Sequence, residues 1–149
     1  MPDESTVERA KEDLREGKSP STAAGEFVHE EIDHVREGKH GARSPQQAIA
    51  IGLSKARRAG IPLKPPARGK AKAKTRQSAE RDYRKGQSGA KKKTSRKRSR
   101  AREAALKREP RGTVSRKALS KQARSAARRR KPAARSQSAR RAASTRRAA

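Results

Sequence analysis

SPQQAIAIGLSKARRAG, residues 44–60, is the stretch that decides the fold, because it concentrates isoleucine and leucine in a chain that has few of either. Ser44 followed by Pro45 is typical of a helix start, with serine as the N-cap and proline at the first helical position. Gln47 stands three residues after the serine, at the offset of a capping box. Gly60 is a residue type that commonly ends a helix. The stretch therefore predicts one well-delimited α-helix.

The helix predicted here has one apolar stripe. Ile49, Leu53 and Ala56 recur at the spacing of a single helical face, whereas Ile51 falls to one side. We expect the stripe to face a core. The remaining surface carries three cations that we expect to point outward: Lys55, Arg57 and Arg58.

Two more helices are predicted before this one. Ser5 and Glu8 have capping-box spacing at the start of the first, and Gly17 is a suitable residue for its end. Ser19, followed by proline, begins the second helix, and Gly38 ends it. The N-terminal part of the chain is therefore predicted to contain three short helices.

Composition limits how much of the chain can fold. The 149 residues include 43 Lys and Arg against 15 Asp and Glu, which gives a formal charge of +28. Leu, Ile, Val and Phe together number 14, or about 9% of the chain, well below the roughly 20% under which a highly charged sequence is expected to be disordered. A single core that uses most of the length is therefore not expected.

Charge and apolar residues are distributed unequally. Residues 1–66 contain 11 basic and 11 acidic residues together with 11 of the 14 large apolar residues. Residues 67–149 contain 32 basic and only 4 acidic residues, so this half carries the whole charge of +28. Such asymmetry is typical of a head joined to a basic tail that binds a polyanion.

The predicted fold is mostly α, with a small marginal three-helix N-terminal unit followed by a disordered, low-complexity basic tail with transient helices. We place the helical domain at residues 1–60, a proline-rich linker at 61–69 and the tail at 70–149. Within the tail, Ser95–Arg108 and Ser115–Lys131 are rich in alanine and other helix formers. Because the head has so few large apolar side chains, we expect it to need self-association or a protein partner.

Several classes of protein are disfavoured by what the sequence lacks. No cysteine is present, so disulfides and thiolate metal sites are excluded. No apolar run approaches the ~20 residues of a membrane span, and the polar opening MPDESTVERA does not fit a signal peptide. The tail offers only Leu106, Val114 and Leu119 as large apolar residues, too few for a membrane-surface helix. We therefore expect a cytoplasmic protein that does not bind membranes.

Two short motifs resemble parts of known catalytic or ligand-binding sites. HEEIDH at 29–34 suggests a zinc protease, but His29 and His34 are five residues apart, about 140° around a helix, and cannot chelate one ion from it. GKS at 17–19 resembles the end of a phosphate-binding loop, but position 12 is glutamate where that loop needs glycine. We expect no enzymatic activity, no small-molecule substrate, no metal site and no cofactor.

The tail is predicted to bind nucleic acid. With 32 cations and 4 anions it can release condensed counterions from a phosphate backbone. The predicted contacts are Lys91, Lys92, Lys93, Arg96, Lys97, Arg98, Arg100, Arg102, Arg116, Lys117, Arg124, Arg128, Arg129, Arg130, Lys131, Arg140, Arg141, Arg146 and Arg147.

The kind of nucleic acid follows from the near absence of aromatic residues. Phe27 and Tyr83 are the only two aromatic side chains, so base-stacking platforms for single strands are missing. We expect phosphate contacts with little sequence preference, and duplex DNA rather than RNA. Two alternatives stay open: an RNA- or ribosome-associated basic protein, and an adaptor whose head binds a protein partner while its tail tethers it to nucleic acid.

Two resemblances accompany these patterns. FVHEEIDHVREGKHG at 27–41 and QAIAIGLSKARRAG at 47–60 resemble a domain of unknown function in small basic bacterial proteins. The match covers about residues 26–60, and it implies a bacterial origin without an assigned chemistry. The Lys-, Ala- and Arg-rich tail is similar to the arms of histone-H1-like bacterial nucleoid proteins, which implies a nucleoid-associated DNA-binding role.

Overall fold

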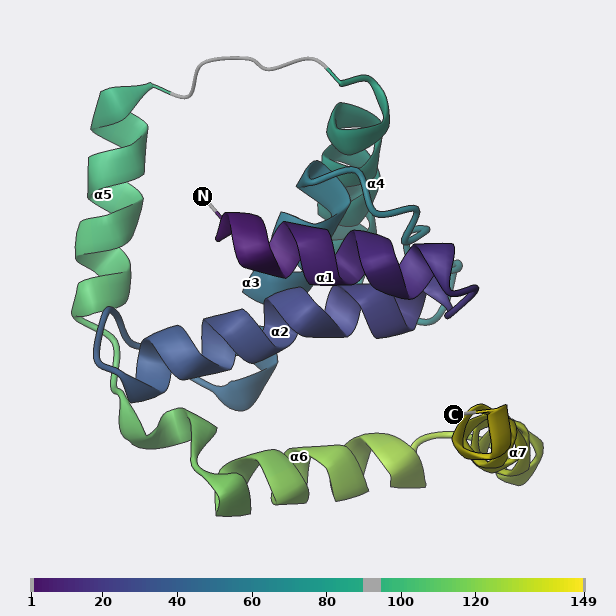
Figure 1. Cartoon of the computed structure of the whole chain (residues 1–149). Coiled ribbons are helices and arrows are strands. Elements are labelled where there is room, and N and C mark those ends of the chain that lie inside the picture. Colours follow the sequence, from purple (N-terminus) through teal and green to yellow (C-terminus); the bar gives the residue numbers. More distant parts are fainter. Residues whose placement is uncertain (1, 90–94, 149) are drawn as a thin grey trace. The chain divides into compact units, whose positions relative to one another are not determined.

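The computed structural model describes residues 2–89 and 95–148, and within these residues the protein is helical and forms no β-strand (Figure 1). The α-helices are α1 (Glu4–Arg15), α2 (Pro20–Arg36), α3 (Pro45–Arg58), α4 (Ala73–Gln87), α5 (Arg96–Lys107), α6 (Arg116–Arg128) and α7 (Pro132–Ala148), with a 3₁₀ turn η1 (Gly112–Val114) before α6. The chain divides into two compact units, Met1–Val114 and Ser115–Ala149. The predicted mostly α class is confirmed.

The ends of α2 and α3 follow the predicted signals. Ser19 and Ser44 are the N-caps, and their hydroxyl oxygens accept hydrogen bonds from backbone amides three residues on, at 3.3 and 3.2 Å. After α1, α2 and α3 the chain turns at the three predicted glycines, all with positive φ: Gly17, Gly38 and Gly60.

The start of α1 differs from the prediction. Ser5 was expected as the N-cap, but the helix begins at Glu4 with Asp3 as its N-cap, and Ser5 lies inside the first turn. The Asp3 side chain makes no capping hydrogen bond. Instead, the backbone amide of Asp3 donates to Oε2 of Glu30 on α2 at 3.3 Å. The start of α1 is therefore accompanied by a contact with α2 and not by the predicted capping box.

Small residues let α3 pack closely on α2. Ala48, Gly52 and Ala56 are the buried apolar positions of α3, whereas the predicted inward residues Ile49 and Leu53 are only half-buried. A Cβ on Gly52 would lie 2.7 Å from the Cα of Val28 on α2. The predicted inward stripe is thus wrong in part, because the α2 backbone approaches too closely for the larger side chains to occupy the centre of the interface.

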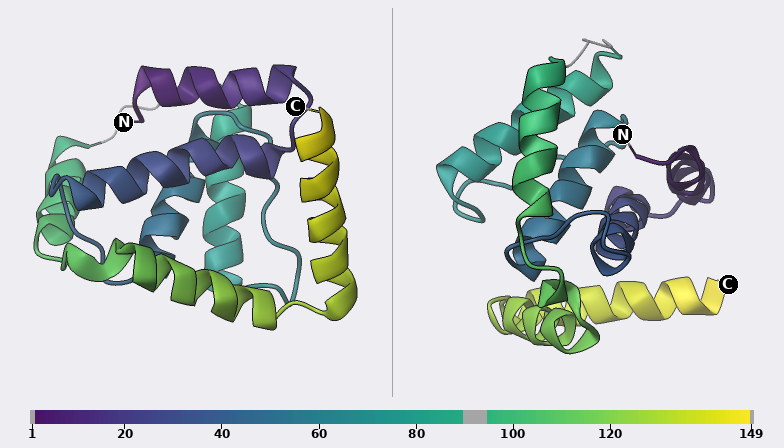
Figure 2. Two further views of the ribbon diagram at one scale, coloured as in Figure 1. Left: turned by 60° about the horizontal axis from the view of Figure 1, so that its bottom comes forward. Right: turned by 90° about the vertical axis from the view of Figure 1, so that its left-hand side faces the viewer.

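Two apolar clusters hold the first unit together. Phe27, fully buried, lies in the larger cluster, where α1 and α2 run side by side (Figures 1 and 2) and α3 also contributes. Its buried members are Ala10, Ala23, Ala24, Phe27, Ala56 and Ile61. The smaller cluster joins the end of α2 to the start of α3, and its buried members are Val35, Ala42, Ala48 and Val114.

The folded unit continues past the boundary predicted at residue 60. Helix α4 packs against α3, and its buried residues are Ala79 and Asp82. A Cβ on Gly86 would overlap the carbonyl oxygen of Arg57, so only glycine permits the approach of α4 to the end of α3. A segment placed in the predicted tail thus belongs to the folded unit.

Residues 106–114 also belong to this unit. The amides of Gly41 and Ala42, in the loop before α3, donate to the carbonyls of Leu106 and Pro110 at 2.9 and 3.0 Å. Thr113 Oγ1 donates to the carbonyl of Ala42 at 2.6 Å. Val114, which is fully buried, completes the smaller cluster.

The predicted division into a domain at 1–60, a linker at 61–69 and a disordered tail at 70–149 therefore differs from the structure. The compact unit reaches Val114, and the disorder expected from residue 70 onward is not confirmed. The prediction used the number of large apolar residues to place the boundary. Polar and backbone contacts, which that number does not include, attach α4 and residues 106–114 to the first three helices. In contrast, α5 and α6 contain no buried residue.

Candidate nucleic-acid interface

The second unit, Ser115–Ala149, contains cations without a single anion. Its sequence holds 13 Lys and Arg and no Asp or Glu. None of these cations can form an ion pair with a side chain of its own unit. The unit therefore presents an uncompensated positive field to any polyanion.

Helix α6 orders part of this charge into a stripe. Lys117, Lys121, Arg124 and Arg128 are exposed and recur at intervals of four, three and four residues, which places them on one face. At 1.5 Å per residue the stripe extends about 16 Å along the helix. The opposite face is half-buried and consists of Ala118, Leu119, Gln122, Ser125 and Ala126. The sequence thus produces a helix with one basic face.

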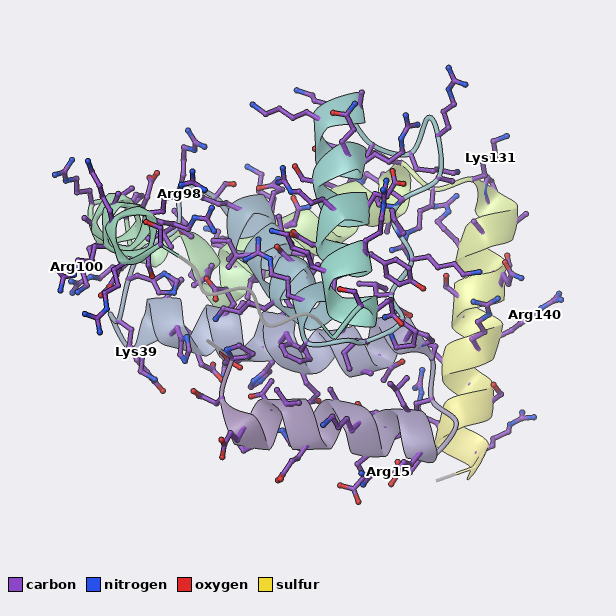
Figure 3. The ribbon with its side chains drawn as sticks, turned by 90° about the horizontal axis from the view of Figure 1, so that it is seen from above. Arg15, Lys39, Arg98, Arg100, Lys131 and Arg140 are labelled. Atoms are coloured by element: carbon purple, nitrogen blue, oxygen red, sulfur yellow. The ribbon has the colours of Figure 1, made fainter. Side chains whose placement is uncertain are left out.

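The chain around and beyond α6 adds further cations. Ser115 caps α6, since its hydroxyl accepts from the amide of Ala118 at 3.3 Å. Arg129, Arg130 and Lys131 follow the helix, and all three are exposed. In α7 the exposed arginines lie on more than one face, and the side chain of Arg140 points away from the helix (Figure 3). The arginines of α7 are Arg135, Arg140, Arg141, Arg146 and Arg147.

Helix α5, in the first unit, is strongly basic at its N-terminal end, whereas Glu103 pairs with Lys107 at 2.8 Å near its C-terminal end. Its exposed cations at the N-terminal end are Arg96, Lys97, Arg98, Arg100 and Arg102. The side chains of Arg98 and Arg100 extend away from the helix axis (Figure 3). The predicted contacts Lys91, Lys92 and Lys93 lie outside the described residues.

Several basic residues of the first three helices pair with acidic side chains of another helix. Arg9 on α1 pairs with Glu26 on α2 at 2.8 Å, and Arg58 on α3 pairs with Asp82 on α4 at 2.9 Å. Burial acts to raise the pKa of Asp82, but hydrogen bonds from Arg58 and Ser54 outweigh it and hold that pKa below its usual value. These charges stabilise contacts between helices instead of facing solvent alone.

Two of the three cations predicted to point outward from α3 do not do so. Lys55 lies 3.1 Å from Glu30 and 2.7 Å from Glu31, and although burial opposes the charge, these carboxylates raise the pKa of Lys55. Arg57 is only 7% exposed, and its Nε donates to the carbonyl of Leu63 at 3.2 Å. Burial lowers the pKa of Arg57, and the charge of Asp82 opposes this. Arg58 is exposed as predicted.

The sequence prediction omitted two cations of the second unit. Lys121 completes the stripe of α6, and Arg135 begins the arginines of α7. In the sequence, both stand apart from the dense clusters of Lys and Arg. The four-, three- and four-residue spacing around Lys121 was visible in the sequence and would have identified it.

No family model, curated protein or solved structure gives a match to this chain. The resemblances to a bacterial domain of unknown function and to histone-H1-like arms therefore remain predictions. Among the described helices, none is both long and apolar enough to cross a bilayer.

Proposed function

We propose that the protein is a non-enzymatic, sequence-nonspecific DNA-binding protein that associates with the bacterial nucleoid in the cytoplasm. One observation carries the proposal: the unit Ser115–Ala149 has 13 cations and no anion. Helix α5 adds exposed cations of the same kind. The first unit would serve as the folded head, and the basic helices would supply the affinity.

The physical basis is counterion release. Each Lys or Arg that neutralises a phosphate of duplex DNA releases a condensed cation, so log K falls against log salt with a slope of about −0.9 per contact. Six to ten contacts would weaken binding by about 10³–10⁵-fold between 50 and 200 mM salt. The 13 cations of the second unit suffice for this range without α5.

Duplex DNA is favoured over single strands because the chain lacks stacking surfaces. Tyr83 is half-buried and lines the same shallow hollow as Pro65 and Pro66. Phe27 is fully buried in the core. Neither ring is an exposed platform on which bases could stack, so contacts to the phosphate backbone remain as the source of affinity.

Binding should also favour the helical state of α6. The stripe places like charges four residues apart, and such pairs destabilise an isolated helix. Phosphates that neutralise the stripe remove this repulsion. We therefore propose that the basic helices become more ordered on DNA than in free solution, which agrees with the transient helices expected from the sequence.

The test compares a variant that lacks the four cations of the stripe with a variant that lacks four exposed cations of the first unit. Full-length protein is titrated with duplex DNA, single-stranded DNA and structured RNA at several salt concentrations. The stripe variant carries Lys117→Gln, Lys121→Gln, Arg124→Gln and Arg128→Gln. The control variant carries Lys11→Gln, Arg15→Gln, Arg43→Gln and Lys64→Gln, all at exposed positions.

The stripe variant should lose about 3–4 units of the log–log salt slope on duplex DNA, at about 0.9 per contact. The control should lose much less. Equal losses in both variants would show that only net charge matters and would overturn the assignment of the interface. Tighter binding to structured RNA than to duplex DNA at every salt concentration would replace DNA with the RNA-associated function.

A further inference from the structure

A buried polar cluster lies where α2, the following loop and α3 meet, far along the sequence from the proposed DNA-binding helices. Glu31 on α2 is fully buried, and its carboxylate has close neighbours from the following loop and from α3. Lys55 Nζ is 2.7 Å from its Oε2, and His40 Nε2 is 3.2 Å from its Oε1. Two of the three histidines of the whole chain, His34 and His40, meet here.

The tautomer of His40 is fixed by its backbone neighbour. His40 Nδ1 lies 3.0 Å from the carbonyl oxygen of Gly41, and a carbonyl can only accept, so Nδ1 carries the proton. In a neutral ring, Nε2 then presents a lone pair to the Glu31 carboxylate. Two acceptors facing each other at 3.2 Å require either a cation between them or a proton on one of them. An Nδ1–H donated to a carbonyl is also the usual support of a histidine that ligates a metal through Nε2.

The charge of the surroundings favours a divalent cation. Asp3, Glu30 and Glu31 supply three negative charges and Lys55 one positive charge, which leaves −2 before the histidines are counted. One divalent ion would balance this charge.

We propose that Glu31, His34 and His40 form a binding site for a divalent transition-metal ion, with Zn²⁺ as the best fit. One ligand atom from each residue lies within 4.8 Å of the others. Ligand atoms on tetrahedral zinc are roughly 3.3 Å apart, since each bond is about 2.0–2.1 Å long. The Glu31–His40 pair already has this spacing, and His34 would have to approach the ion to complete the set of three protein ligands. The two histidine side chains are each 14% exposed, so they are partly accessible to solvent, and a water molecule would take the fourth position.

Such a site would also stabilise the attachment of residues 106–114. His40 immediately precedes Gly41 and Ala42, whose amides donate to Leu106 and Pro110. Metal binding that fixes His40 against Glu31 and His34 of α2 would therefore hold the amides of Gly41 and Ala42 in place. The ion would strengthen the part of the first unit that leads into the DNA-binding helices.

The experiment uses full-length protein treated with a chelator and then titrated with Zn²⁺ alone or Co²⁺ alone. Calorimetry gives stoichiometry and affinity, and the visible absorption of Co²⁺ reports coordination. His40→Gln is the test variant. His29→Gln is the control, because His29 lies on α2 with Glu31 and His34 but is 75% exposed and pairs with Asp33.

We expect one metal ion per chain and an affinity at least about tenfold weaker in His40→Gln, with His29→Gln unchanged. Because the test variant could unfold, nitrogen NMR of the wild-type imidazoles provides a second readout, in which Zn²⁺ should shift His34 and His40 but not His29. Shifts confined to His29, or equal affinity in wild type and His40→Gln, would overturn the site. The site would also be overturned if Asp3→Asn lost Zn²⁺ binding while His40→Gln kept it. That result would assign the ion to the neighbouring group Asp3, Glu30 and His34. Absence of Zn²⁺ binding with both nitrogens of His40 protonated would assign the cluster to an ion pair instead.

Discussion

Helices α1–α4 of the first unit and the helices of the second unit use Lys and Arg in different ways. In the first, Arg58 pairs with Asp82 and Lys55 with Glu30 and Glu31, so cations join helices whose apolar side chains are few. In the second, 13 cations have no acidic residue within their unit. Whether Lys and Arg build a fold or an interface thus depends on the carboxylates available to them. Four predictions test or sharpen this contrast.

The largest effect is expected from removing Ser115–Ala149. Loss of its 13 cations should lower the affinity for duplex DNA at about 100 mM salt by about 10³-fold or more. Fluorescence anisotropy with labelled duplex DNA measures this loss. The contrast fails if the truncated chain retains comparable affinity, while circular dichroism checks that its first unit remains helical.

Removing a large side chain should cost more unfolding free energy in the first unit than in the second. Phe27→Ala removes the largest fully buried side chain and should cost about 3–5 kcal/mol of unfolding free energy. Leu119→Ala removes a half-buried side chain from α6, where no residue is fully buried, and should cost less than about 1.5 kcal/mol. Urea unfolding followed by circular dichroism measures both changes. Similar costs would show that the second unit has a core of its own.

The close approach of α3 to α2 can be tested at one glycine. Gly52→Val should destabilise the first unit by about 1–3 kcal/mol, because its Cβ would overlap the backbone of Val28. Gly25→Ala is the matched control on α2, since its Cβ would meet nothing within 4 Å, and it should stabilise the helix by about 0.5–1 kcal/mol. Thermal unfolding of the two variants measures the difference. If both variants changed the stability only slightly and equally, α2 and α3 could move apart without destabilising the first unit.

The smallest effect concerns the ion pair that attaches α4. Asp82→Asn should cost about 1–2 kcal/mol, because it leaves Arg58 without its carboxylate, and the 46% exposure of Arg58 moderates the loss. The depressed folded pKa of Asp82 gives the pH dependence its sign. Its contribution is present above the unfolded value of about 3.9 and is lost as the pH falls below that value through the folded pKa.

Denaturant unfolding between about pH 7 and pH 3 should therefore show a steeper loss of stability in wild type than in Asp82→Asn. Glu80→Gln, which breaks an exposed pair with Arg84 on the same helix, is the control and should leave the profile nearly unchanged. Parallel profiles for wild type and Asp82→Asn would show that the pair does not contribute to the attachment of α4.

Local sequence determined the ends of α2 and α3 and the distribution of charge. Serine–proline starts and glycine ends fixed α2 and α3, because these signals act through adjacent backbone groups. The neutral first half and the basic second half, on which the proposed interface depends, are properties of composition alone. The stripe on α6 also follows from spacing, since a helix places residues four, three and four apart on one face.

Only the tertiary structure decided where the folded unit ends and what its polar residues do. Asp82 and Val114, far from α3 in sequence, supply a carboxylate and an apolar side chain that complete contacts with it and its preceding loop. The close α2–α3 approach moved the centre of the interface from Ile49 and Leu53 to Gly52. The same approach brought Glu31, His40 and Lys55 together, although no local pattern links them. Pairings of this kind depend on distances between helices, which neither periodicity nor composition can specify.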